Sequence, residues 1–170
     1  MTSPSITEDQ IMTGLRAFIL DVLPKNVGIE VVQGQDNGVP MPAAGDFVVM
    51  TPARRQQMSQ TARAYDPDAE EKEISRSTSL HFRLDTYGPN ASDYVQIITT
   101  LFRDEYGFNF FKTYGLAPLY CDDGQQMPLV SGENTYVQRW MMNGLLQSNL
   151  AVTVGQQFAD TLITTLREYH

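Results

Sequence analysis

The sequence predicts an α+β domain in which helices pack on one face of a mainly antiparallel, twisted sheet. Three observations lead to this prediction. An N-terminal segment repeats apolar residues at helical spacing, residues 74–85 alternate between apolar and polar side chains, and residues 135–154 keep one apolar parity along most of a long extended run. A helix, strands, a helix and strands again, in that order, are typical of the α+β class.

The first helix is expected to begin after Thr7 and to end before Pro24. Thr7 and Gln10 have the spacing of a capping box, in which each side chain accepts a hydrogen bond from the other residue's backbone amide. Pro24 cannot continue the helix. The apolar stripe of this helix comprises Ile11, Leu15, Phe18, Ile19 and Val22.

Two strands are expected next, at residues 27–32 and 46–51, and we expect them to pair across a loop rich in proline and glycine. Residues 51–73 hold few apolar side chains and combine arginines with an acidic cluster, so they are predicted to form an exposed loop or flap. The strand at 74–85 would place one face on the core and leave its polar face wet or at an interface.

The rest of the chain predicts a second helix, an aromatic-rich segment and a long strand. Trp140 lies on the predicted core face of that strand, and Gly144 and Asn149 are candidates for bulges or bends. The remaining expectations are a helix starting at Asn90 or Ser92, a short helix or turn at 106–114, strands at 116–120 and 127–130, and a segment at 162–169 that fits helix and strand equally.

The composition bounds the class of protein. With 170 residues the chain suits a single domain spanning residues 1–170, and its net charge of −8 opposes a surface that grips nucleic-acid phosphate. It contains no apolar run of the roughly 18 residues that a membrane helix needs, and the N-terminus does not resemble a secretory signal. The single cysteine, Cys121, excludes an intrachain disulfide and fits a reducing cytoplasm.

The residues that carry chemistry form no catalytic set in the sequence. His81 and His170 are far apart, and nothing near Cys121 in sequence supplies a basic partner. The acidic run at 66–73 lacks the glycine and the final acid of a calcium loop, and the glycines match no phosphate-binding fingerprint. We therefore expect no enzymatic activity, no metal and no cofactor. A small-molecule-binding or hydrolytic α+β domain is the alternative from another class, and it would need a pocket with convergent polar groups.

Four segments resemble structural proteins of tailed phages. They are EVVQGQDNGVPMP (30–42), DFVVMTPARR (46–55), DTYGPNASDYVQIITTLFRDEYG (85–107) and GLAPLYCDDGQQMPLVSGENTYVQRW (115–140). The family most similar to them is that of neck-terminator or tail-terminator proteins, which join phage heads to tails. The resemblance extends from about Ile6 to Tyr169 and is weakest between Arg55 and Glu73.

This resemblance implies a ring-forming subunit, usually of a hexamer, that caps the tail tube and joins it to the head connector. The genome would pass through the ring's lumen without specific binding. The protein would then be a virion component made in the cytoplasm of the host bacterium, with no membrane partner. Net acidity suits a lumen that repels DNA, and it equally suits plain solubility. A head-closure or tail-completion protein on the portal side is the alternative role.

A ring of identical subunits needs heterologous contacts, in which one patch of the surface binds a different patch on the next copy. The polar face of the strand at 74–85 and the arginine-rich segment before it offer such surfaces. The candidate interface residues are Arg54, Arg55, Arg63, His81 and Arg83.

Overall fold

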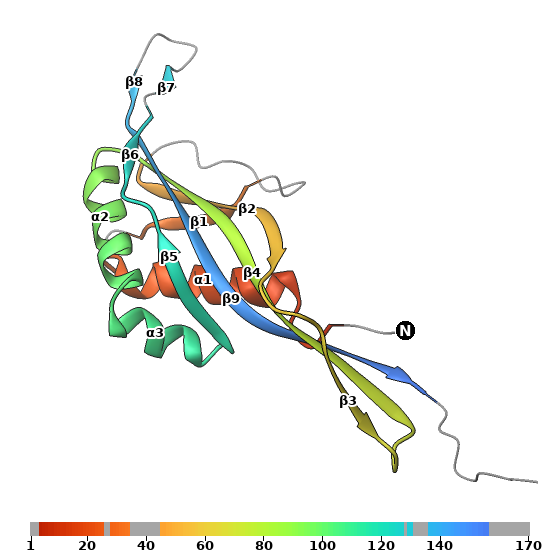
Figure 1. The fold of residues 1–170 in the computed structure, drawn as a ribbon. Helices are drawn as coiled ribbons and strands as arrows, with labels where there is room; N and C mark the ends of the chain where they lie inside the picture. Colours follow the sequence, from red (N-terminus) through yellow and green to blue (C-terminus); the bar gives the residue numbers. More distant parts are fainter. Residues whose placement is uncertain (1–3, 26–27, 35–44, 128, 131–135, 157–170) are drawn as a thin grey trace, which may run out of the picture.

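The computed structural model describes residues 4–25, 28–34, 45–127, 129–130 and 136–156 (Figure 1). Within them the three helices are α1 (Glu8–Val22), α2 (Ala91–Phe102) and α3 (Glu105–Lys112). The strands are β1 (Glu30–Gln33), β2 (Phe47–Gln57), β3 (Ala62–Asp66), β4 (Glu71–Tyr87), β5 (Leu116–Cys121), β6 (Gln125–Gln126), β7 (Leu129–Val130), β8 (Tyr136–Val137) and β9 (Arg139–Gly155). The predicted segment at 162–169 lies outside the described residues.

The main sheet has the strand order β1-β2-β4-β9-β5, while β3 pairs with β4 and β6 pairs with β9. Its strand pairs are antiparallel except for β1 and β2, which are parallel. The α+β class and the mainly antiparallel sheet are therefore confirmed. The two early strands pair as expected, and a parallel pair requires the long connection that separates them.

Helix α1 begins at the predicted capping box. The Gln10 amide donates to Oγ1 of Thr7 over 3.3 Å, and the Thr7 amide donates to Oε1 of Gln10 over 2.8 Å. Leu23 is the C-cap residue, immediately before Pro24. Both helix ends are therefore set by local chemistry that the sequence displays.

The main core lies between the helices and one face of the sheet, and a smaller cluster of Val32, Phe47 and Val49 lies apart from it. Phe18 of α1 contacts the rings of Phe102 and Phe111 at centroid distances of 6.0 and 4.8 Å, and Phe102 contacts Phe82 of β4 at 5.7 Å. All four rings are at most 1% exposed. Helices on one face are thus confirmed, and residues from α1, α2, α3 and the central strands share this one cluster.

The structure corrects the prediction for residues 51–73. Strand β2 continues to Gln57, β3 follows, and β4 already begins at Glu71, so most of this stretch is strand and not loop. The predicted exposure is right, since every residue of β3 is exposed. Pairing with the long strand β4 orders a segment that has little apolar surface of its own.

The structure also corrects two expectations in β9. Gly144 and Asn149 pair with Phe82 and Ser77 in an unbroken register, so neither is a bulge. A Cβ at Gly144 would lie 2.3 Å from Cζ of Phe82, and the glycine therefore makes room for that ring. Trp140 packs against the core but is only partly buried.

Candidate assembly surface

The face of the sheet opposite the helices carries three of the five predicted interface residues. In the antiparallel register Arg54 lies opposite His81, and Thr51 lies opposite Arg83. Paired residues point to the same face, and His81 and Arg83 have the parity opposite to the buried Phe82. The structure therefore brings Arg54, His81 and Arg83 together on the open face of the sheet.

A buried carboxylate organises one end of this open face. Asp85 is 2% exposed, and its Oδ2 accepts a hydrogen bond from Nε of Arg83 over 2.9 Å. Its Oδ1 accepts from Nε and Nη2 of Arg139 over 3.0 and 2.8 Å. The Arg139 guanidinium lies 5.7 Å from the ring centre of Tyr87, which stacks on Phe47. Burial raises the pKa of Tyr87. This arrangement holds two cationic side chains in place on the surface.

The sequence prediction missed Asp85 and Arg139. Asp85 stood in the polar half of an alternating strand, where nothing marked it as buried. Arg139 reaches it because β9 pairs with β4, which places Arg139 opposite Tyr87. The two residues are 54 positions apart in sequence, so the contact depends on a long-range register that local patterns do not reveal.

His81 is half-buried on the open face. Its Nε2 is buried and has no hydrogen-bond partner among the described residues. Loss of solvation lowers the pKa of His81, and the positive charge of Arg54 lowers it further. The imidazole is therefore neutral at pH 7 and contributes shape and a nitrogen lone pair or N–H to this face, not a charge.

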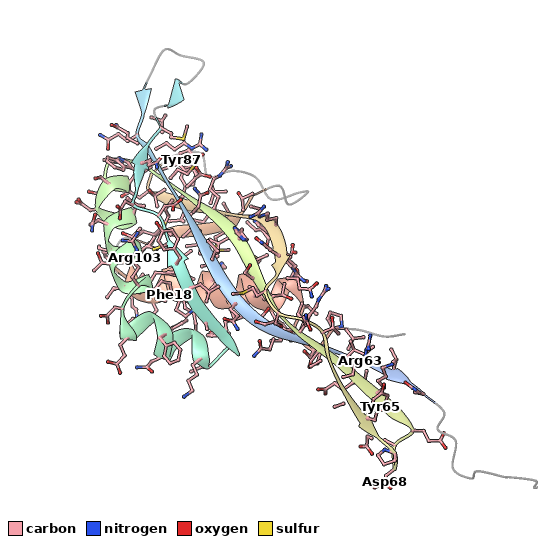
Figure 2. The ribbon with its side chains drawn as sticks, in the orientation of Figure 1. Phe18, Arg63, Tyr65, Asp68, Tyr87 and Arg103 are labelled. Carbon is pink, nitrogen blue, oxygen red and sulfur yellow. The ribbon has the colours of Figure 1, made fainter. Side chains whose placement is uncertain are left out.

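Arg55 and Arg63 lie apart from the other three candidates. A register shift between Pro52 and Arg54 turns β2, and the next residue, Arg55, reaches Glu8 of α1 with Nη2 and Oε2 3.3 Å apart. This ion pair places Arg55 on the helix side. Arg63 belongs to β3, and Figure 2 shows it in the part of the molecule that projects beyond the helices, farther from the tip than Tyr65 and Asp68. The five residues therefore form no single patch.

Arg63 belongs to a projection that we call the arm. The arm consists of β3, residues 71–77 of β4 and residues 149–155 of β9, and it extends beyond the helices (Figure 1). Arg63, Tyr65 and Asp68 lie along it in Figure 2. Three strands without a covering helix bury little apolar surface, and β3 is exposed along its whole length.

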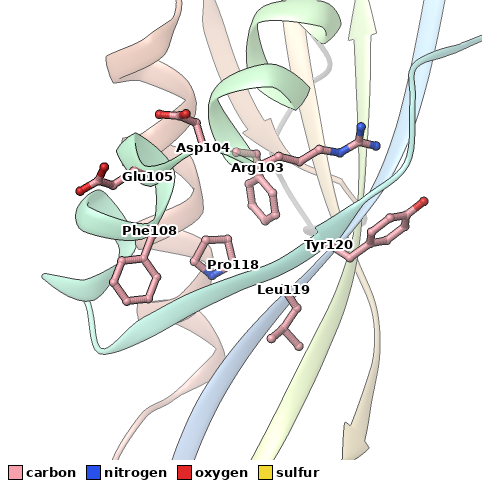
Figure 3. A pocket seen from close by; sticks show the side chains of 8 residues that line it. Arg103, Asp104, Glu105, Phe108, Pro118, Leu119 and Tyr120 are labelled. Carbon is pink, nitrogen blue, oxygen red and sulfur yellow. The ribbon is translucent and has the colours of Figure 1, made fainter.

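A second surface lies at the edge of the sheet formed by β5, the edge opposite β1, and it is bordered by α3. A hollow of about 310 Å³ opens there, and we call it the α3–β5 groove (Figure 3). Phe108 and Leu119 beside it are 48% and 41% exposed. Asp104 and Glu105, at the start of α3, provide carboxylates at its rim. Exposed apolar side chains bordered by charge are typical of protein–protein contact sites.

The described residues hold no group of three or more histidine, cysteine, aspartate or glutamate side chains able to bind a metal ion. Cys121 is buried, and burial raises the pKa of its thiol, so this cysteine is protonated at pH 7. None of the described helices is long and apolar enough to cross a membrane.

A comparison with protein families matches residues 9–166 to the model of the phage neck terminator protein. This match spans nearly the whole chain. The chain belongs to the phage neck terminator family. The family is one of structural phage tail proteins, and the chain is accordingly a virion component.

Curated proteins include no detectable relative of this neck terminator. Among solved structures, it is similar to the sheath/tube terminator of an extracellular contractile injection system, PVC, in the extended state. The identity is 10% and the TM-score is 0.48, over 97% of this chain and 64% of the other. The chain thus spans a little under two thirds of that protein's length.

Proposed function

We propose that this neck terminator forms a ring, a hexamer, that caps the phage tail tube and joins the tail to the head connector. Membership of the neck terminator family over residues 9–166 is the observation that carries the proposal. The partners would be further copies of the chain, the tail tube protein and the head connector protein. DNA would pass through the lumen of the ring.

The surfaces of the subunit support such an assembly. A ring requires two different patches that meet in a head-to-tail manner. The open sheet face, the arm and the α3–β5 groove are three distinct surfaces of this kind on one subunit. The open face is also preorganised, since Asp85 fixes Arg83 and Arg139 before any partner arrives. Fixed side chains lose less conformational entropy on binding.

The overall charge supports the passage of DNA without binding. A net charge of −8 opposes the attraction of phosphate that DNA-binding surfaces depend on. The basic side chains on the open face are partly neutralised by Asp85. We expect the measured affinity for double-stranded DNA to be negligible at physiological salt.

The test is to assemble phage tails with and without the protein and to measure tail length and joining to heads by electron microscopy. Native mass spectrometry over a range of protein concentrations gives the number of subunits in the ring. Without the protein, we expect tails of irregular length that fail to join heads. Tails of uniform length that join heads normally would contradict the role. A ring seen on the portal side, away from the tube, would favour a head-closure or tail-completion protein.

A charge reversal on the open face tests that surface within the same assay. We expect Arg54→Glu to weaken ring formation or head joining while the fold persists, because Arg54 is exposed beside His81. Lys25→Glu is the matched control, because Lys25 is exposed and pairs only with Asp21 near the end of α1 among the contacts described. Equal effects of the two variants would show that net charge, and not the open face, matters.

A further inference from the structure

The arm continues the face of the sheet that the helices cover in the rest of the molecule. Strands β4 and β9 pair without a register shift from Tyr87 and Arg139 to Glu71 and Gly155. Every second residue of β4, counted from the buried Phe82 and Leu80 toward Glu71, therefore lies on one face of the arm together with its partner on β9. The described helices end before the arm, so none of them covers this face (Figure 1).

The two faces of the arm differ sharply in chemistry. The pairs Arg63 with Ile74, Tyr65 with Lys72, Ile74 with Val152 and Lys72 with Val154 place apolar and basic side chains on the face that continues the core side. The pairs Asp66 with Glu71 and Ala64 with Glu73 place the acidic side chains on the other face. The described arm thus has one basic apolar face and one acidic face.

The α3–β5 groove has the complementary character. Its apolar surface comes from Phe108, Pro118 and Leu119, and its rim carries Asp104 and Glu105. Arg103 also borders the groove, but its charge is paired with Asp123, with Nη1 and Oδ1 3.1 Å apart. The groove therefore offers net negative charge around an apolar hollow, which suits a basic apolar partner.

The edge of β5 favours contacts through side chains over the addition of a strand. Pro118 lacks an amide hydrogen, and a register shift between Pro118 and Tyr120 bends the strand. Arg103 donates from Nε to the carbonyl oxygen of Cys121 over 3.0 Å and so occupies another backbone acceptor. A proline and a bulge are the usual protection of an edge strand against pairing.

We propose that the basic apolar face of the arm docks in the α3–β5 groove of a second copy of the chain. This inference rests on the proposed ring and names the contact that would build it. Arg63 and Lys72 would face the carboxylates of Asp104 and Glu105, while Val152 and Val154 would cover Phe108 and Leu119. The contact is heterologous, since the arm and the groove lie on different parts of each subunit, and repeating it closes a ring if the rotation allows.

The first experiment is a disulfide cross-link in the full chain. The variant Leu119→Cys/Val154→Cys places one thiol in the groove and one on the docking face of the arm. Leu119→Cys/Thr153→Cys is the matched control, because Thr153 is the neighbouring residue and points to the acidic face. The native Cys121 is buried and should not interfere. Under mild oxidation we expect a ladder of covalent multimers from the first variant and monomers from the control.

The other outcomes of this experiment separate the docking from the ring. A ring without a ladder, or equal ladders from both variants, would overturn the docking and leave the terminator role in place. A cross-link from the arm to a different tail protein would contradict the proposal that the arm binds a second copy of the chain. A chain that remains monomeric in solution and in assembled tails would contradict the ring itself.

A charge exchange provides the second experiment. Lys72→Glu and Glu105→Lys should each raise the concentration at which multimers form by roughly tenfold, as loss of one central contact does. The double variant should recover most of this loss, because the two charges again attract. Asp104 is left unchanged because its side chain caps α3 by accepting from the Tyr106 amide. No recovery in the double variant, with both single variants folded, would contradict a contact between these two sites.

Discussion

The helix-covered part of the sheet and the arm share two strands but differ in what keeps those strands in place. In the covered part, Leu80, Phe82 and Leu84 of β4 are at most 2% exposed beneath the helices. In the arm, the equivalent face of the same strand carries the half-buried Ile74, and β3 beside it is wholly exposed. The same register therefore continues from a region ordered mainly by burial into one ordered mainly by strand pairing, with Leu150 of β9 buried at its base.

This difference indicates where the stability of the subunit resides. Burial of apolar surface is the main source of folding free energy, and the arm contributes little of it. A region with few buried contacts opens more easily than the core. The arm therefore depends mainly on the pairing of β3 and β9 with β4.

The sharpest test of the comparison is a pair of substitutions on the same face of β4. Phe82→Ala should lower the free energy of unfolding by about 3–5 kcal/mol, because it empties a fully buried site. Ile74→Ala, in the arm, should lower it by about 1 kcal/mol or less. Urea unfolding followed by circular dichroism measures both. Similar losses for the two variants would show that the arm is part of the core.

A second comparison concerns a buried and an exposed carboxylate. Asp85→Asn should lower the free energy of unfolding by about 1–3 kcal/mol, because it weakens charge-assisted hydrogen bonds from Arg83 and Arg139. Asp68→Asn, near the tip of the arm, should change it little, because the Asp68 side chain is exposed. The same urea experiment compares them. An equally small loss of unfolding free energy in both variants would mean that hydrogen bonds to water replace those that Arg83 and Arg139 donate to Asp85.

The two regions also differ in how far the sequence predicted them. The capping box at Thr7 and Gln10 and the alternation in residues 74–85 are local signals, and both elements form as expected. The strands at 51–73 were predicted as a loop or flap, because their apolar content is low and their order comes from pairing with β4. Local patterns of apolar residues indicate which side chains are buried, and these strands bury few side chains.

The same limit explains the mixed result for the candidate interface. Side-chain parity placed His81 and Arg83 on the polar face correctly, and Arg54 joins them through the pairing of β2 with β4. Arg55 lies on the other side because of a register shift that no residue type announces. The α3–β5 groove was not predicted, since the segment at 106–114 was predicted only as a short helix or turn, and the sequence does not show which of its aromatic side chains stay exposed.

A smaller effect is expected at the helix that covers the sheet. Thr7→Ala removes the side-chain cap of α1 and should lower the free energy of unfolding by about 1 kcal/mol. Thr13→Ala is the matched control, because Thr13 is exposed within the same helix and alanine favours a helix interior. Thermal unfolding should show a lower midpoint for the first variant and an unchanged or higher midpoint for the second. Equal midpoints would mean that packing alone fixes the start of α1.

The smallest expected effect concerns the ionisation of His81 on the open face. Its pKa lies below the ordinary value of 6.5, first because the imidazole has lost solvation and second because Arg54 is close. The unfolded chain therefore binds this proton at a higher pH than the folded one, and the stability associated with neutral His81 is lost as the pH falls below about 6.5.

Arg54→Ala should raise the pKa of His81 only part of the way toward its ordinary value, since the loss of solvation remains. NMR titration of the His81 ring, with His170→Gln to remove the second histidine, measures this shift. Gln57→Ala is the control, because Gln57 is also exposed in β2 but pairs with Thr78 and so points to the other face. An unchanged pKa of His81 in Arg54→Ala would show that the Arg54 guanidinium points away from His81. Arg54 would then not share the surface that His81 and Arg83 form on the open face.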